Sequence, residues 1–154
     1  VFPAMKPTRE GVFVQYIEAE MPSGGALYDV AADPAASGGK HLHVSPTGKE
    51  KATEYAFRVP EKGTYFVLIR LRAGQPGSRR TTLRFCVDDG PMDRSRLRSG
   101  PAWGWCMAAH NPNQSLTCLQ SFKLAAGEHV LKIAPESPAR IDVIAITDNP
   151  RMFD

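Results

Sequence analysis

The sequence has few cysteines, no long apolar run and no strong excess of one charge, and each absence removes a class of protein. Its three cysteines lack C-x-x-C spacing, which argues against a zinc site, and they permit at most one intrachain disulfide. No run of about eighteen apolar residues is present, so no membrane span is expected. The net charge of +3 is too weak to predict a nucleic-acid partner, and the positive charge is local, with arginines clustered over residues 79–84 and 94–98.

Motifs of common catalytic sites are also missing. No serine lies in G-x-S-x-G, no phosphate-binding glycine loop is present, and the four histidines do not form a metal-binding set. We therefore expect that the chain is not an enzyme in its own right. An alternative is a catalytic jelly roll, such as a lyase that uses His and Tyr as acid and base.

Glycine and proline are abundant, with thirteen of each spread between short apolar runs. Over residues 64–72 one side of the chain carries Tyr65, Val67, Ile69 and Leu71 and the other carries Phe66, Leu68, Arg70 and Arg72, which is the period of a strand packed on one face. Similar runs occupy residues 13–20, 52–59, 82–88, 121–124, 130–133 and 141–147. Residues 121–124 and 130–133 flank a turn and predict a hairpin. The sequence thus predicts an all-β fold, a two-sheet antiparallel β-sandwich or jelly roll.

A chain of 154 residues fits one domain. We expect an N-terminal extension or linker over 1–12, the sandwich over 13–148 and a C-terminal tail over 149–154. The N-terminus has neither a starting Met nor a signal-peptide core, so it is interpreted as that of a processed or excised fragment. Three long connections, over 21–40, 89–102 and 108–120, are the expected locations of function.

The order of several landmarks resembles that of carbohydrate-binding modules of families 6 and 35. The landmarks are Glu18-Ala19-Glu20, the Gly38-Gly39 turn, Val59-Pro60, Gly63-Thr64-Tyr65, Val87-Asp88, Trp103-Gly104-Trp105, Gly127-Glu128-His129-Val130-Leu131 and Ile141-Asp142-Val143-Ile144. The resemblance covers roughly residues 13–148. It implies a calcium-stabilised, secreted or extracellular sandwich with a galactose-binding-like, lectin-like fold. It also implies a non-catalytic module that targets an attached enzyme or surface protein to polysaccharide.

A structural calcium ion is one of these expectations. Glu18 and Glu20 lie two apart, so on a strand both carboxylates face the same side and need a cation. The resemblance adds Asp142 and a backbone carbonyl near Lys40 as further ligands. The alternative is a solvated acidic edge.

The resemblance also implies where a sugar would bind. Trp103 is expected to be the sugar platform, whereas Trp105 is expected in the core. Arg140 lies where relatives carry a polar sugar-binding side chain, and an arginine there favours a uronate or another anionic polysaccharide. Tyr28 is a candidate second aromatic wall, and His43 lies where relatives often place a stacking aromatic. The alternative is a scaffold or protein-interaction domain with a degenerate sugar site.

The three cysteines allow one intrachain disulfide, and the sequence does not fix its partners. Cys106 and Cys118 bracket an apparent insertion and form the favoured pair, with Cys86 as a competing partner.

Overall fold

The computed structural model of the protein describes residues 13–46, 52–107 and 120–151. The described chain is built from strands: β1 (Val14–Glu18), β2 (Gly24–Gly25), β3 (Asp29–Ala32), β4 (Lys40–Val44), β5 (Thr53–Val59), β6 (Gly63–Ala73), β7 (Arg80–Val87), β8 (Asp93–Arg98), β9 (Gly104–Met107), β10 (Ser121–Leu124), β11 (Gly127–Pro135) and β12 (Ala139–Thr147). A short 3-10 turn, η2 (Ser37–Gly39), precedes β4. No helix in the described segments is long and apolar enough to cross a membrane.

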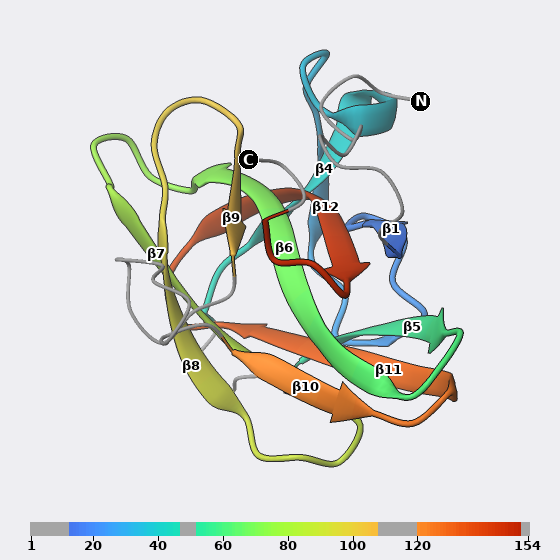
Figure 1. Ribbon diagram of the computed structural model, residues 1–154. Helices are drawn as coiled ribbons and strands as arrows, with labels where there is room; N and C mark the ends of the chain where they lie inside the picture. Colours follow the sequence, from blue (N-terminus) through green and yellow to red (C-terminus); the bar gives the residue numbers. More distant parts are fainter. Residues whose placement is uncertain (1–12, 47–51, 108–119, 152–154) are drawn as a thin grey trace.

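The strands form two antiparallel sheets that face each other, as Figure 1 shows. The first sheet has the order β10-β6-β12-β4-β3, with β1 added to β12 and β9 added to β6. The second has the order β2-β5-β11-β7-β8, so β8 is an edge strand. The all-β sandwich predicted from the sequence is confirmed.

The core lies between the sheets and is made of the side chains that point inward from each strand. The predicted inward faces are confirmed, because Tyr55, Phe57 and Val59 of β5 are all buried. Tyr65, Val67, Ile69 and Leu71 of β6 are buried in the same cluster. Each large apolar side chain removed from water contributes about 1.5–3 kcal/mol. This burial fixes the strand registers, because a slip of one residue would turn every inward side chain outward.

The predicted hairpin between residues 121–124 and 130–133 is wrong. Strand β10 pairs with β6 in the first sheet, whereas β11 pairs with β5 and β7 in the second. The chain therefore crosses from one sheet to the other between Leu124, which is buried in the core, and Gly127. Gly127 has a φ of 121°, which glycine adopts without the strain of a side chain.

The outer face of the first sheet carries a second, smaller apolar cluster. Leu68 and Ala145 are buried there, and Trp105 and Tyr16 pack against them with ring centroids 6.3 Å apart. The prediction that Trp105 belongs to the sandwich core is therefore wrong. Strand β9 pairs with β6 so that Trp105 lies opposite Arg70 and shares the outward side of the sheet.

Candidate functional site

A pocket lies at one end of the sandwich, where the loop after β6 meets the loop before β9. Its volume is about 440 Å³ and its lining residues are Arg72, Ala73, Gly74, Gln75, Pro76, Gly77, Ser78, Arg79, Gly100, Pro101 and Arg140. Of the described residues that line it, three are arginines and none is a carboxylate. The pocket therefore presents positive charge and suits an anionic group.

Backbone contacts hold the pocket's two loops together. The amide of Ala73 donates to the Gly100 carbonyl at 2.8 Å, and the amide of Ser99 donates to the Arg79 carbonyl at 3.0 Å. A Cβ atom at Gly74 would lie 2.4 Å from the backbone of Pro138, so glycine is needed for this close approach. The loop is thereby seated against the start of β12, which carries Arg140.

Trp103 lies beside this pocket in a network of polar side chains. Its indole N–H donates to the Asp33 carboxylate at 3.1 Å. Oδ2 of the same carboxylate forms an ion pair with Nη2 of Arg72 at 3.2 Å. The Arg72 guanidinium lies 5.1 Å from the centre of the indole ring. Trp103 is half-buried, so it holds Arg72 and Asp33 in place as well as presenting a partly exposed ring.

Arg140 joins the network through His41. Its Nη1 donates to Nε2 of His41 at 3.0 Å, and the His41 ring lies 5.2 Å from the Trp103 ring. Because arginine only donates, His41 must accept and is therefore neutral. Burial, together with the charges of Arg140 and Arg72, lowers the pKa of His41 and keeps this form. The structure thus brings Trp103 and Arg140 to the same site, through an intervening histidine.

Asp33 remains charged in this setting. The hydrogen bond from the Ala35 amide lowers the pKa of its carboxyl group, and the Trp103 N–H and Arg72 add to that effect, which together outweigh the opposing effect of burial. Asp33 therefore neutralises Arg72, whereas Arg79 and Arg140 have no carboxylate partner in the described part of the chain. These two arginines are the ones available to an anionic ligand.

The other two predicted ligand residues lie further away. Tyr28 is half-buried and packs against the main core, and it does not line the pocket. His43 lies on β4 opposite Arg140 of β12, and Asp29 of β3 is its partner on the other side. Burial and the charge of Arg140 lower the pKa of His43. His43 therefore borders the site on the sheet.

Four residues of the site and its network were not among the predicted ones: Arg72, Arg79, Asp33 and His41. Arg72 follows Arg70 by two positions on β6, so the alternation already placed it on the outward face. Arg79 and Asp33 lie in loops whose positions no local pattern fixes. Only the folded chain brings Asp33 to Trp103, seventy residues away.

The predicted calcium residues also converge. Ser37 connects two of them, since its hydroxyl donates to Oε1 of Glu18 at 2.6 Å and its amide donates to Oδ1 of Asp142 at 2.9 Å. Oδ2 of Asp142 forms a buried ion pair with Arg70. The expectation that Glu18 and Glu20 lie on one strand is wrong, because β1 ends at Glu18 and Glu20 lies in the turn that follows.

The chemistry of the unused oxygens fits a hard cation. Oε2 of Glu18 and Oε2 of Glu20 are buried without a hydrogen-bond partner among the described residues. Burial raises the pKa of Glu20 to about 7, and the neighbouring charges of Glu18 and Asp142 add to the effect. No set of three or more Asp, Glu, His or Cys side chains in the described segments could hold a metal. Backbone carbonyls would have to complete the coordination, since both Asp142 oxygens are engaged.

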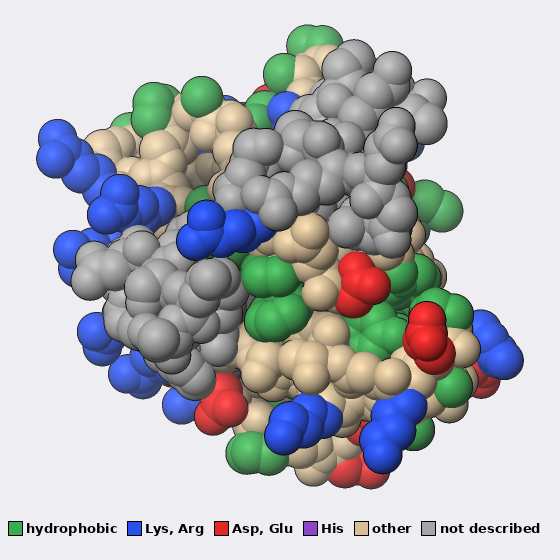
Figure 2. Space-filling view, viewed as in Figure 1, with side chains coloured by type: hydrophobic (Ala, Val, Ile, Leu, Met, Phe, Trp, Pro, Cys, Tyr) green, Lys and Arg blue, Asp and Glu red, His purple; other side chains and the backbone are tan. Residues whose placement is uncertain are grey.

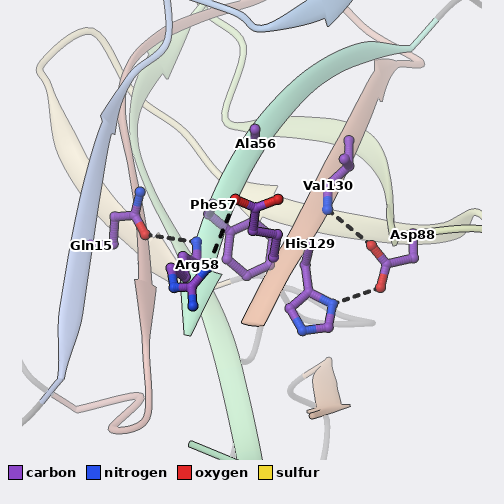
Figure 3. A pocket seen from close by; sticks show the side chains of 8 residues that line it. Gln15, Ala56, Phe57, Arg58, Asp88, His129 and Val130 are labelled. Carbon is purple, nitrogen blue, oxygen red and sulfur yellow. Dashed lines mark hydrogen bonds and ion pairs between the residues drawn. The ribbon is translucent and has the colours of Figure 1, made fainter. Parts of the chain in front are cut away.

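A second pocket, of about 430 Å³, is lined by residues of β1, β5 and β11 together with Asp88 (Figure 3). His129 there places Nδ1 2.7 Å from the Asp88 carboxylate and Nε2 2.7 Å from the Ala125 carbonyl. Both partners are acceptors, so the imidazole carries two protons and a positive charge. Burial lowers the pKa of His129, but these bonds and the Asp88 charge outweigh it and raise the pKa above its usual value. With both nitrogens engaged, His129 cannot act as a free base.

Cys106 and Cys86 are both buried. Sγ of Cys106 lies 2.8 Å from the Arg98 carbonyl oxygen. Cys118 lies outside the described residues, so the disulfide between Cys106 and Cys118 stays a prediction. Cys86 lies on the outer face of the second sheet, opposite Lys132.

Comparison with known proteins gives a result at the level of the fold. No family model and no curated sequence matches the chain. The family 35 carbohydrate-binding module from Clostridium thermocellum superimposes with a TM-score of 0.63 at 20% identity, covering 86% of this chain and 97% of that one. The CBM35 from Cellvibrio japonicus Abf62 gives a TM-score of 0.63 at 11% identity, covering 87% and 92%.

Larger enzymes contain the same fold as one part. The GH26-CBM35 β-(1,4)-mannanase of Podospora anserina matches with a TM-score of 0.65 at 17% identity, covering 90% of this chain but 28% of that one. The cycloisomaltooligosaccharide glucanotransferase of Paenibacillus sp. matches with a TM-score of 0.61 at 18% identity, and this chain spans 18% of its length. The resemblance inferred from the sequence landmarks is confirmed: the chain has the β-sandwich fold of family 35 carbohydrate-binding modules.

Proposed function

We propose that this protein is a non-catalytic carbohydrate-binding module whose ligand is an anionic sugar, a uronate or a sulfated residue, held in the pocket at the end of β6. The observation that carries the proposal is the pocket's lining, which holds three arginines and no carboxylate and in which only Arg72 is paired, with Asp33 from outside the lining. A neutral sugar needs no such charge. An anionic group gains charge-assisted hydrogen bonds there, which are roughly twice as strong as neutral ones.

Arg140 and Arg79 are the residues that contact the anion. Arg140 uses one of its five N–H donors on His41, so donors remain for a carboxylate or sulfate. Its guanidinium is held in orientation by that bond, which lowers the entropy lost when a ligand binds. Arg72 is a positioning residue, because its charge is already paired with Asp33.

Trp103 supplies the apolar part of the recognition. A sugar ring presents C–H groups on one face, and an indole ring offers a flat apolar surface for them. The indole is immobilised by its hydrogen bond to Asp33, so its ring is pre-oriented beside Arg72. The combination favours a ring that has both an apolar face and a negative substituent.

The fold comparison supports the sugar-binding class and the domain context. Two of the matching structures are named as carbohydrate-binding modules of family 35, and a third is a mannanase that carries such a module. We extend this to the present chain: it is attached to further domains, acts outside the cell and brings an attached enzyme or surface protein to polysaccharide. The module itself performs no catalysis.

We also propose a structural calcium ion at Glu18 and Glu20. The two buried oxygens without partners support it, since calcium is bound by carboxylate and carbonyl oxygens. When bound, the ion neutralises two carboxylates that otherwise repel each other. The family resemblance also implies a carbonyl near Lys40 and Asp142 as ligands, and Asp142 would have to share an oxygen that already accepts from Ser37 or Arg70.

Isothermal titration with galacturonate and glucuronate oligosaccharides tests the function. Binding is expected for these ligands, whereas neutral gluco-oligosaccharides of equal length should bind at least tenfold more weakly. The Arg79→Gln/Arg140→Gln variant should lose the binding. The control is Lys62→Gln/Lys123→Gln, which removes the same charge at the opposite end of β6 and should bind normally. No binding to any sugar by the parent protein would favour a scaffold domain instead.

A further inference from the structure

The outer face of β7 and β8 carries a ladder of arginines in register. Leu83 and Phe85 of β7 and Leu97 of β8 point into the core, so the residues between them point outward. The cross-strand pairs on the outward side are Arg80 with Arg98, Thr82 with Arg96 and Arg84 with Arg94. Five arginines thus share one face of a two-strand edge, here called the arginine ladder.

One carboxylate compensates part of this charge. The Glu136 carboxylate forms ion pairs with Nε of Arg94 at 2.6 Å and with Nε of Arg84 at 2.7 Å. These two arginines lower the pKa of its carboxyl group. Within the described part of the chain, no carboxylate lies within ion-pair distance of Arg80, Arg96 or Arg98. The far half of the ladder therefore presents three guanidinium groups with no internal counter-charge.

Such an arrangement costs stability. Like charges directly opposite each other on neighbouring strands are destabilising, and Arg80 faces Arg98 in that way. Charge on an edge strand does protect a sheet from pairing with another chain, and β8 is an edge strand. Protection of the β8 edge does not need arginines on the neighbouring strand β7. An external anion would turn this repulsion into attraction.

We propose that the arginine ladder is a second binding surface, for a linear polysaccharide that carries regularly spaced sulfates or carboxylates. Successive outward residues on a strand lie about 6.8 Å apart, so the three rows span roughly 14 Å, enough for several charged groups of one chain. Arginine forks bind such groups in a bidentate manner. Lys and Arg side chains gather along the edge that β7 and β8 form, as a comparison of Figures 1 and 2 shows.

The outward composition favours polysaccharide over nucleic acid. Surfaces that bind single-stranded nucleic acid combine basic residues with aromatic side chains on which bases stack. The outward residues of the ladder are arginines and Thr82, with no aromatic side chain among them. The ladder is also continuous with the sugar pocket, because Arg79 lines that pocket and Arg80 begins β7. The proposal does not depend on the pocket, since it rests on the ladder alone.

Affinity measurements on immobilised polymers test the proposal. The probes are dextran sulfate, polygalacturonate and neutral dextran, with duplex DNA as a polyanion of another class. The test variant is Arg80→Ser/Arg96→Ser/Arg98→Ser, whose side chains are exposed, so folding should persist and is checked by melting temperature. The control is Arg58→Ser/Lys62→Ser/Lys123→Ser, which lowers the net charge equally and lies outside the ladder.

The parent protein should bind one or both charged polysaccharides and not neutral dextran, and comparison of the two identifies sulfate or carboxylate as the preferred group. The ladder variant should bind about tenfold more weakly or worse at low salt. The slope of log affinity against log salt concentration should be smaller in magnitude by about 2 for this variant, because each of the three arginines contributes roughly 0.7 to the slope. Equal losses in the two variants, no binding by the parent, or tighter binding of duplex DNA than of either polysaccharide would overturn the proposal.

Discussion

Arg70 and Asp142 form a buried ion pair that connects the proposed sugar site to the proposed metal site. The Asp142 side chain is fully buried and the Arg70 side chain is 10% exposed. Arg70 also donates to the Ala35 carbonyl at 3.2 Å and lies 5.6 Å from the Trp103 ring. The pair therefore links β6, β12 and the loop that carries Asp33.

Removal of one partner should be costly. Arg70→Met leaves Asp142 buried without its counter-charge, and we expect a loss of about 3–5 kcal/mol in the free energy of unfolding. Denaturant titration measures it. The matched control is Arg58→Met, which breaks an exposed pair with Glu128 and should cost about 1 kcal/mol or less. Similar small losses in both variants would mean that Asp142 does not need Arg70.

Calcium should raise the melting temperature of the protein. A ligand that binds only the native state at a hundred times its Kd adds about 2.7 kcal/mol, and EDTA should remove this gain. The Glu18→Gln/Glu20→Gln variant should show no calcium response, because it lacks the two carboxylates whose buried Oε2 atoms have no hydrogen-bond partner among the described residues. An equal calcium response in parent and variant would place the ion elsewhere, and no response in the parent would remove the calcium proposal.

The ion pair of His129 with Asp88 should make stability depend on pH. The raised pKa of His129 means that its contribution is fully present below about 6.5 and is lost as the pH rises through the higher folded-state value. His129→Gln should therefore destabilise the protein more at pH 6 than at pH 9, as measured by denaturant unfolding. Asp88→Asn should remove most of the same difference, because its carboxylate holds the proton on His129. A pH-independent cost would show that His129 is neutral in the fold.

The cysteines should differ in reactivity. A disulfide between Cys106 and Cys118 would close a loop of about a dozen residues and add roughly 3 kcal/mol. Cys86 should remain a thiol that reacts slowly with iodoacetamide in the native state, because burial raises its pKa. Mass spectrometry before and after unfolding, on protein purified without reductant, measures both. Three free thiols would exclude the bridge.

The sequence predicted the strands well because alternation has a physical cause that is local. In β5 and β6, every second residue faces the core, and that period is visible without any tertiary information. The sheet to which a strand belongs is not local. β10 and β11 flank a turn typical of a hairpin, yet they pair with different partners because Leu124 is buried in the core.

The site was predictable only in part for the same reason. Trp103 and Arg140 were identified from landmarks, and the structure does bring them to one site. The bridging roles of His41 and Asp33 depend on contacts across 99 and 70 residues, which no spacing encodes. Trp105 was assigned to the core because a buried tryptophan is the usual case in a sandwich. The pairing of β9 with β6 instead turns it outward.

The measurement that tests the central claim most directly is a heteronuclear NMR titration of the protein with a uronate trisaccharide. The account predicts that the largest shift changes fall on Arg79, Arg140 and the Trp103 indole N–H, with Arg72 and Gly100 next. They should be absent with a neutral trisaccharide and should disappear in Arg79→Gln/Arg140→Gln. Shift changes confined to another face, or equal changes with the neutral sugar, would contradict an anion-selective site in this pocket.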